Sequence, residues 1–207
     1  MRILLTAGPT HEPIDPVRFI GNRSSGKMGA AIAAAAFKAG HLTTAILGPV
    51  SVPFPAGVSR IDVQTASEMH KAVLAEFPKY DLLILAAAVA DFRPKQIHAE
   101  KLARHGSLSI ECEATEDIAL AAGKYKLPHQ RTIGFALESE GSLDRARGKL
   151  FAKHLDLIVF NPLSTLESPT ISATLIYPDG RTEPLASASK ADFADILLQR
   201  AAALWNP

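Results

Sequence analysis

The stretch RILLTAGPTHEPIDPVRFIGNRSSGKMGAAIAAAAFKAG, residues 2–40, decides the fold. It begins with a short apolar run at 2–7, which has the length of a β-strand. A loop of about seventeen residues follows. A helical segment then begins near Ser25, passes through the alanine-rich tract at 30–36 and stops at Gly40. A strand, a loop and a helix in this order open a βαβ unit, and the small alanine side chains let the helix lie close to a sheet.

The same alternation continues along the chain and predicts a mainly parallel sheet. Further strands are expected at 41–47, 81–88, 107–112, 132–137 and 157–160, and further helices at 67–77, 116–125, 142–154 and 190–204. Two apolar segments, 171–177 and 181–185, flank Pro178, Asp179 and Gly180, which predicts a β-hairpin near the end of the chain. We therefore expect one α/β domain over residues 1–207.

Composition and charge exclude several classes of protein. The chain has 207 residues, 47% of them hydrophobic, and Lys+Arg 22 against Asp+Glu 21 gives a formal net charge of +1. This balance argues against a general nucleic-acid binder. The longest apolar run, 82–90, is shorter than the roughly 20 residues of a membrane span. No secretory signal is visible, and Cys112, the only cysteine, cannot form an internal disulfide. We expect a cytoplasmic protein.

The end of the first loop has the chemistry of an anion site. Ser24, Ser25 and Gly26 offer hydroxyl and backbone N–H groups at the positive end of the helix dipole, although one serine could instead be only the N-cap. The P-loop pattern fails because Met28 follows Gly26-Lys27. The dinucleotide fingerprint lacks its glycines and its acidic residue, which disfavours an NAD(P) oxidoreductase.

Several segments together resemble a known family. The sequence TAGPTHEPIDPVRFIGNRSSGKMG at 6–29 is similar to the opening of bacterial phosphopantothenoylcysteine synthetase, the second activity of bifunctional coenzyme A biosynthesis enzymes. The similarity continues through AAAVADFRP (86–94), Glu100-Lys101, GFALE (134–138) and KHLDLIVFN (153–161), and so covers nearly the whole chain. None of these segments resembles the flavin-dependent decarboxylase half of the bifunctional form.

The resemblance implies a Rossmann-like, three-layer fold and a ligase that joins 4′-phosphopantothenate to L-cysteine. CTP is the implied co-substrate: the carboxylate attacks the α-phosphate, pyrophosphate leaves, and the cysteine amine attacks the resulting acyl-cytidylate. Mg²⁺, or Mn²⁺, accompanies the nucleotide. A homodimer built from the sheet-edge or hairpin region is implied, and we expect the hairpin to offer an apolar edge that a monomer would leave unpaired. In-line attack at a phosphate requires positioned cations and donors more than a covalent protein nucleophile.

The resemblance also implies roles for individual residues. Asn22 and Lys101 match catalytic positions, Lys101 being the cation expected at the reacting phosphate. Matches to substrate-binding positions are Arg18, Ala87 and Ala88. Matches to nucleotide-binding positions are Asp91, Lys101, Glu116, Asp117, Ile118, Phe135, Lys149 and Lys153. The chain departs from the family pattern in the segment after Lys101, which is less basic, and at Thr115-Glu116, where many members have Asn-Pro on the cytosine side.

Each of these residues also has a structural interpretation. Lys101 could be a solvated loop charge, and Arg145, Lys149 and Lys153, spaced every four residues, could form a solvated helix face. Asp91 could cap a helix, Phe135 could belong to the core, and Cys112 is interpreted as structural. Scattered histidines without paired ligands disfavour a histidine metal site. For the whole chain, the alternative is a catalytically silent nucleotide-binding module.

Overall fold

The computed structural model describes residues 1–104, 106–138, 143–165 and 168–205, and its centre is one mixed sheet of eight strands. Strand order is β12-β11-β10-β9-β6-β1-β4-β5. The six parallel strands are β1 (Arg2–Ala7), β4 (Leu42–Leu47), β5 (Ser59–Asp62), β6 (Leu82–Leu85), β9 (Arg131–Glu138) and β10 (Leu157–Pro162). The antiparallel hairpin β11 (Thr170–Ile176) and β12 (Thr182–Ser189) completes the sheet, as expected from its turn sequence.

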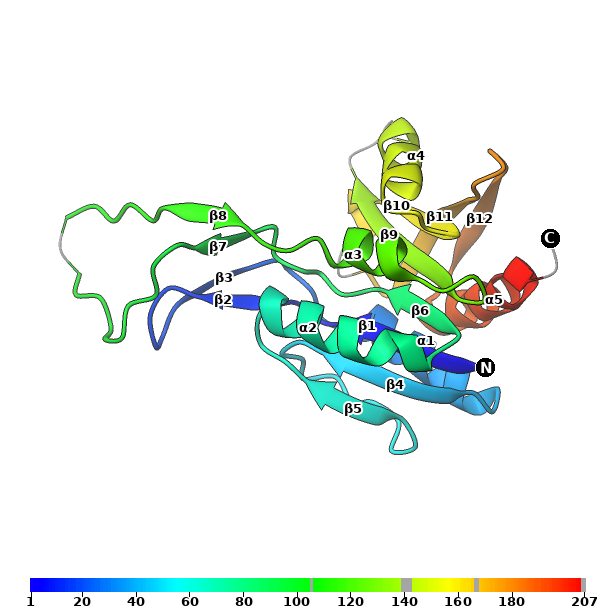
Figure 1. Ribbon diagram of the computed structural model, residues 1–207, viewed down its shortest axis with the longest axis horizontal. Helices are drawn as coiled ribbons and strands as arrows, with labels where there is room; N and C mark the ends of the chain where they lie inside the picture. Colours follow the sequence, from blue (N-terminus) through cyan, green and yellow to red (C-terminus); the bar gives the residue numbers. More distant parts are fainter. Residues whose placement is uncertain (105, 139–142, 166–167, 206–207) are drawn as a thin grey trace.

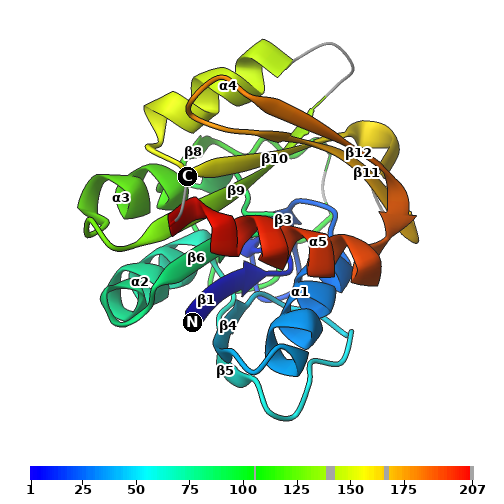
Figure 2. The same cartoon turned by 90° about the vertical axis from the view of Figure 1, so that its right-hand side faces the viewer.

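Helices cover both faces of the sheet and give the expected three layers (Figures 1 and 2). On one face lie α1 (Lys27–Lys38) and α5 (Lys190–Ala202), which pack against each other. On the other face lie α2 (Ala66–Glu76), α3 (Ile118–Tyr125) and α4 (Leu143–Ala152). Short 3₁₀ turns follow α2, β10 and α5, at Phe77–Lys79, Leu163–Thr165 and Ala203–Trp205.

The first strand shows why its sequence is almost continuously apolar. Ile3 and Leu5 point into the core beneath α1 and α5, whereas Leu4 points to the opposite face beneath α2. All three side chains are fully buried. A central parallel strand is covered on both faces, so it does not alternate apolar and polar residues.

The structure contains an extension that the sequence pattern does not predict. The long first loop holds a short hairpin, β2 (His11–Pro13) and β3 (Phe19–Gly21), and a second ribbon pairs β7 (Phe92–Pro94) with β8 (Cys112–Ala114). These four strands and the segments that connect them, here called the extension, project from one end of the molecule (Figure 1). The strand expected at 107–112 is therefore wrong in position, because pairing with β7 begins at Cys112. The edge strand β5 was also missed.

Two helix starts differ from the expectation. Helix α1 begins at Lys27, after Gly26 in the left-handed conformation (φ 73°), where a Cβ atom would approach Val50 to 2.6 Å. Helix α3 begins at Ile118 because Asp117 is its N-cap and accepts a hydrogen bond from the Leu120 N–H. The expected start of the fourth helix, at 142, lies outside the described residues.

Candidate functional site

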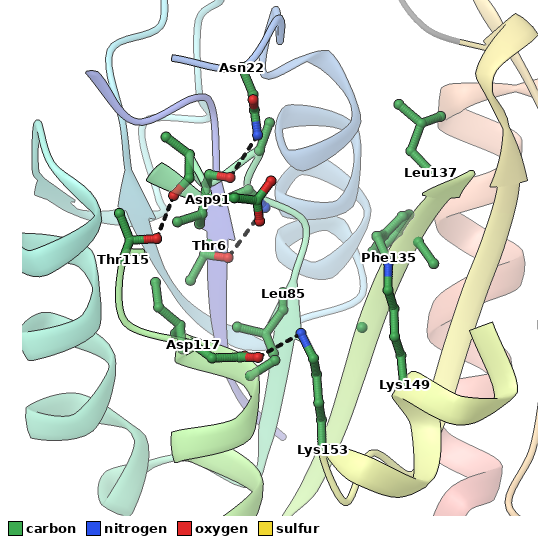
Figure 3. Close-up of a pocket in the computed structure, with 18 of the residues that line it drawn as sticks. Thr6, Asn22, Leu85, Asp91, Thr115, Asp117, Phe135, Leu137, Lys149 and Lys153 are labelled. Carbon is green, nitrogen blue, oxygen red and sulfur yellow. Dashed lines mark hydrogen bonds and ion pairs between the residues drawn. The ribbon is translucent and has the colours of Figure 1, made fainter. Parts of the chain in front are cut away.

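A pocket of about 630 Å³, here called the first pocket, lies at the carboxyl ends of β1, β6 and β9 (Figure 3). Open α/β sheets bind ligands at this edge. Three parts of the chain form its walls: the strip that follows β6 at 87–91, the residues around the start of α3 at 115–119, and the end of β9. Lys149 and Lys153 enter it from α4 and the residues just after that helix (Figure 3).

Hydrogen bonds hold the strip after β6 in place. The Thr6 hydroxyl accepts from the Ala87 N–H at 3.3 Å, and the Thr10 hydroxyl accepts from the Ala90 N–H at 2.9 Å. The Asn22 side-chain amide donates to the Val89 carbonyl at 2.7 Å. Asn22 is thereby fixed above the strip, so the amide that the resemblance makes catalytic lies at a defined place in the pocket.

The opposite wall carries paired charges. The Arg93 guanidinium donates to Glu116 at 3.0 Å and to Glu113 at 2.9 Å. The Glu116 backbone N–H and the Arg93 guanidinium hold the pKa of Glu116 below its usual value. The Thr115 hydroxyl donates to the Ala90 carbonyl at 2.6 Å and joins this wall to the strip.

A second pocket of about 190 Å³ adjoins the first, and both include Arg23, Ala87, Ala88, Phe135 and Leu137 in their linings. It lies at the N-terminus of α1, where no side chain caps the helix. The lysine on its far side, Lys190, is the first residue of α5. The amino ends of two helices therefore border one small space.

The second pocket is strongly cationic. Arg23, Lys27 and Lys190 line it, and among the described residues no acidic side chain does. Burial, and then the nearby charge of Lys27, lower the pKa of Lys190. The Asn161 Oδ1 atom is buried and has no hydrogen-bond partner within the described part of the chain. Several positive side chains lie close together beside the amino ends of two helices, and this arrangement favours an anionic ligand.

The structure brings most of the expected site residues together. Ten of them line the first pocket: Asn22, Ala87, Ala88, Asp91, Glu116, Asp117, Ile118, Phe135, Lys149 and Lys153. Arg18 and Lys101 line neither the first nor the second pocket. Both lie on the extension, where the Arg18 guanidinium donates to the Leu102 carbonyl at 3.2 Å. Lys101 itself is exposed.

Several structural interpretations can now be decided. Neither Ser24 nor Ser25 is the N-cap of α1, because Gly26 is; the Ser24 hydroxyl instead accepts from the Gly26 N–H at 3.2 Å. Asp91 does not cap a helix, since β7 follows it. Phe135 packs partly on the core and also lines both pockets. Arg145 is exposed and lies outside the pocket linings.

Sequence analysis missed the cations of the second pocket. Lys27 was visible as part of the first loop and helix, but Lys190 lies far away in sequence. Only the hairpin, which returns β12 to the carboxyl edge of the sheet, brings the start of α5 there. No cluster of three or more His, Cys, Asp or Glu side chains that could hold a metal occurs in the described ranges. In the same ranges, no helix is long and apolar enough to cross a membrane.

Comparisons with known proteins point to one family. The family model "DNA/pantothenate metabolism flavoprotein C-terminal domain" matches residues 1–204. The coenzyme A biosynthesis bifunctional protein CoaBC of Bacillus subtilis (strain 168) is 41% identical, over 98% of this chain and 51% of its own length. A prokaryotic protein named cysteine/cysteine sulfinic acid decarboxylase is 48% identical, over 78% of this chain and 46% of its own. The chain thus spans about half the length of these relatives.

A solved structure supports the same family. The crystal structure of the C-terminal domain of a CoaBC protein superposes with a TM-score of 0.84 and 38% identity. The match covers 97% of this chain and 93% of that domain. The similarity therefore extends over the sheet, both helical layers and the pockets between them.

Proposed function

The chain belongs to the family of DNA/pantothenate metabolism flavoprotein C-terminal domains, and we propose that it is the ligase that joins 4′-phosphopantothenate to L-cysteine in coenzyme A biosynthesis. CTP is the proposed co-substrate, converted to CMP and pyrophosphate. The observation that carries this proposal is the pair of adjoining pockets, one cationic and one of mixed polarity, which share the backbone at Ala87 and Ala88.

The charges favour one direction for the bound nucleotide. A triphosphate is attracted to the second pocket, where Arg23, Lys27 and Lys190 converge on the uncapped amino end of α1. The base and ribose then lie toward Thr115 to Ile118 in the first pocket, with Phe135 beside them. The α-phosphate meets the acyl substrate between the two pockets, above Ala87 and Ala88.

The proposed reaction has two steps. The carboxylate of 4′-phosphopantothenate attacks the α-phosphorus of CTP, the bond to the bridging oxygen breaks and pyrophosphate leaves. The cysteine amine then attacks the acyl carbon and loses a proton, and CMP leaves. Lys101 neutralises charge at the α-phosphate in the first step. Asn22, fixed by its bond to Val89, orients the acyl-cytidylate for the second.

The donor set of the first pocket is compatible with Mg²⁺ or Mn²⁺ held mainly by phosphate oxygens. Glu116 is paired with Arg93 and Asp117 with Lys153, which leaves Asp91 as the best placed of the lining carboxylates. Magnesium in nucleotide sites is commonly bound by one or two carboxylates and by phosphates. When bound, the metal would lower the negative charge of the triphosphate.

Pyrophosphate release tests this proposal. The chain is incubated with 4′-phosphopantothenate, cysteine, Mg²⁺ and either CTP or ATP, and both pyrophosphate and the cysteine adduct are measured. We expect turnover with CTP far above turnover with ATP, because a base pocket with unpaired polar groups binds the wrong base poorly. Equal turnover with CTP and ATP would contradict the cytosine selectivity but would still support the ligase activity. Nucleotide binding without any adduct would instead identify a catalytically silent module.

A further inference from the structure

We propose that Asp15 is a positioning residue that fixes Lys101 relative to the loop carrying Asn22. This inference rests on the proposed function, in which Lys101 acts at the reacting phosphate. Asp15 lines neither pocket, and its side chain is completely buried. A buried carboxylate is stable only when hydrogen-bond donors surround it. The groups that donate to Asp15 therefore show which parts of the chain it connects.

The two carboxylate oxygens of Asp15 serve different parts of the chain. Oδ1 accepts from the backbone N–H groups of Val17 and Arg18, both at 2.8 Å, and so shapes the tip of the β2–β3 hairpin. Oδ2 accepts from the Leu102 N–H at 3.2 Å and from the Arg18 guanidinium at 3.1 Å. Oδ2 thus joins two segments that lie more than eighty residues apart.

Two further bonds strengthen this junction. The Arg18 guanidinium also donates to the Leu102 carbonyl at 3.2 Å, so both backbone polar groups of Leu102 are bound. The His98 N–H donates to the Ile14 carbonyl at 2.9 Å. The segment 98–102 is therefore attached at both ends to the hairpin tip at 14–18. Lys101 directly precedes Leu102, and its backbone cannot shift without breaking these bonds.

The hairpin tip leads through β3 directly to Asn22, whose amide is bound to Val89 at the first pocket. One set of hydrogen bonds thereby connects the residue proposed for the first step with the residue proposed for the second. Lys101 lies outside the pockets on the extension, so it meets a phosphate when the extension closes or when a second copy supplies it. In either case the Asp15 bonds determine where Lys101 stands on the extension.

The charge of Asp15 supports this role. Burial alone would raise the pKa of Asp15, but the N–H groups of Val17, Arg18 and Leu102 and the Arg18 guanidinium outweigh burial and lower it. The group therefore remains an acceptor at neutral pH. An amide in its place has one oxygen and one NH₂ group, so it can satisfy either the hairpin tip or Leu102, but not both.

The test is Asp15→Asn, with Asp81→Asn as the matched control. Asp81 is a carboxylate that, like Asp15, accepts from a backbone N–H and from an arginine, in this case both of Arg2. It is partly exposed and lies at the opposite edge of the sheet. We expect Asp15→Asn to slow single-turnover pyrophosphate release about 10- to 100-fold. The KM for CTP should change by less than about threefold, and Asp81→Asn should release pyrophosphate at the wild-type rate.

A double-mutant cycle separates positioning from general damage. If Asp15 acts through Lys101, adding Asp15→Asn to Lys101→Gln should lower the rate by less than about twofold. A full 10- to 100-fold further loss in the double variant would overturn the inference. So would a wild-type rate for Lys101→Gln, since Asp15 could then not act through that lysine.

Amide hydrogen exchange on the wild-type protein keeps the inference testable if Asp15→Asn does not fold. The Leu102 amide should be protected to the same extent as those of Val17 and Arg18, because all three donate to the same carboxylate, that of Asp15. Exchange of the Leu102 amide at the rate of a free peptide would overturn the inference. Absence of turnover in the wild type with either nucleotide would defeat the proposed function instead.

Discussion

The ammonium group of Lys153 lies 3.0 Å from the carboxylate of Asp117 and joins the segment after α4 to the start of α3 across the first pocket. Asp117 also caps α3 through Leu120, so one carboxylate holds a helix and a pocket cation. In the proposed orientation the α-phosphate lies between the two pockets, and it competes with Asp117 for this lysine. Lys153 is thus already held in position before a ligand arrives.

Lys153→Ala and Lys149→Ala should weaken nucleotide binding more than they slow the chemical step. Both cations line the pocket in the ligand-free chain, and contacts made equally in ground and transition states appear in KM. We expect the KM for CTP to rise about tenfold, the loss of a charge-assisted hydrogen bond. Arg145→Ala, on the exposed face of α4, is the control. A large fall in kcat with unchanged KM would contradict this assignment.

Lys190→Ala should raise the KM for CTP about tenfold and weaken inhibition by pyrophosphate to a similar degree, because the second pocket is proposed to hold the outer phosphates. Lys38→Ala removes a lysine from the opposite end of α1 and should change neither constant. Isothermal titration with pyrophosphate measures the effect without turnover. Unchanged pyrophosphate affinity in Lys190→Ala would place the outer phosphates elsewhere.

The sequence predicted the sheet and its helices because their signals are local. Each central strand is a nearly continuous apolar run, and the turn around Gly180 identified the hairpin. The extension has no such local signal, because each of its strands has only three residues. In addition, the long segment 95–111 separates β7 from its partner β8. The site residues on the strip at 87–91 were predicted from the family resemblance. The position of Lys190 at the site could not be predicted, because it depends on the order of the strands in the sheet.

The ion pair between Arg2 and Asp81 should make the free energy of unfolding depend on pH. The hydrogen bond from the Arg2 side chain is the main cause of the lowered pKa of Asp81, and burial partly opposes it. Because the pKa is lower in the folded chain, the unfolded chain takes up a proton first on acidification, and the stabilisation is lost as pH falls. It is complete above the ordinary pKa of 3.8.

Urea unfolding of wild type and Asp81→Asn measures this contribution. At pH 7 the variant should lose about 1 kcal/mol, a small value because both partners are partly exposed. The difference should shrink as the pH is lowered below about 4. If the difference in unfolding free energy between wild type and variant grew on acidification, the pKa of Asp81 would not be lowered in the folded chain.

We expect a homodimer, and the structure favours the extension over the hairpin as the contact between its two copies. The hairpin was expected to offer an apolar edge, but none of the eight residues of β12 is buried and most are small or polar. The extension instead exposes five large apolar side chains, Val17, Phe19, Phe92, Ile97 and Leu108, each more than half exposed. Groups of exposed apolar side chains commonly mark interaction surfaces.

Light scattering at micromolar concentration tests the dimer. The wild type should have twice the mass of one chain, and Phe92→Lys should shift the mass toward the monomer. Thr182→Lys, on the edge strand β12, should leave the dimer intact. A monomeric wild type with full activity would refute the dimer, and dissociation by Thr182→Lys alone would return the contact to the hairpin.

The last prediction separates the two steps of the reaction. Lys101→Gln should suppress formation of the acyl-cytidylate, because removal of one stabiliser of transition-state charge typically costs about 10²- to 10³-fold in rate. Asn22→Asp should still release pyrophosphate once but transfer poorly to cysteine. The amide of Asn22 donates to Val89 and can donate to the acyl-phosphate, which a carboxylate at neutral pH cannot do. Rapid quench with labelled CTP should therefore show cytidylate accumulating in the Asn22 variant and not in the Lys101 variant. If both variants stalled before pyrophosphate release, or both completed one turnover at the wild-type rate, the two residues would not divide the reaction between them.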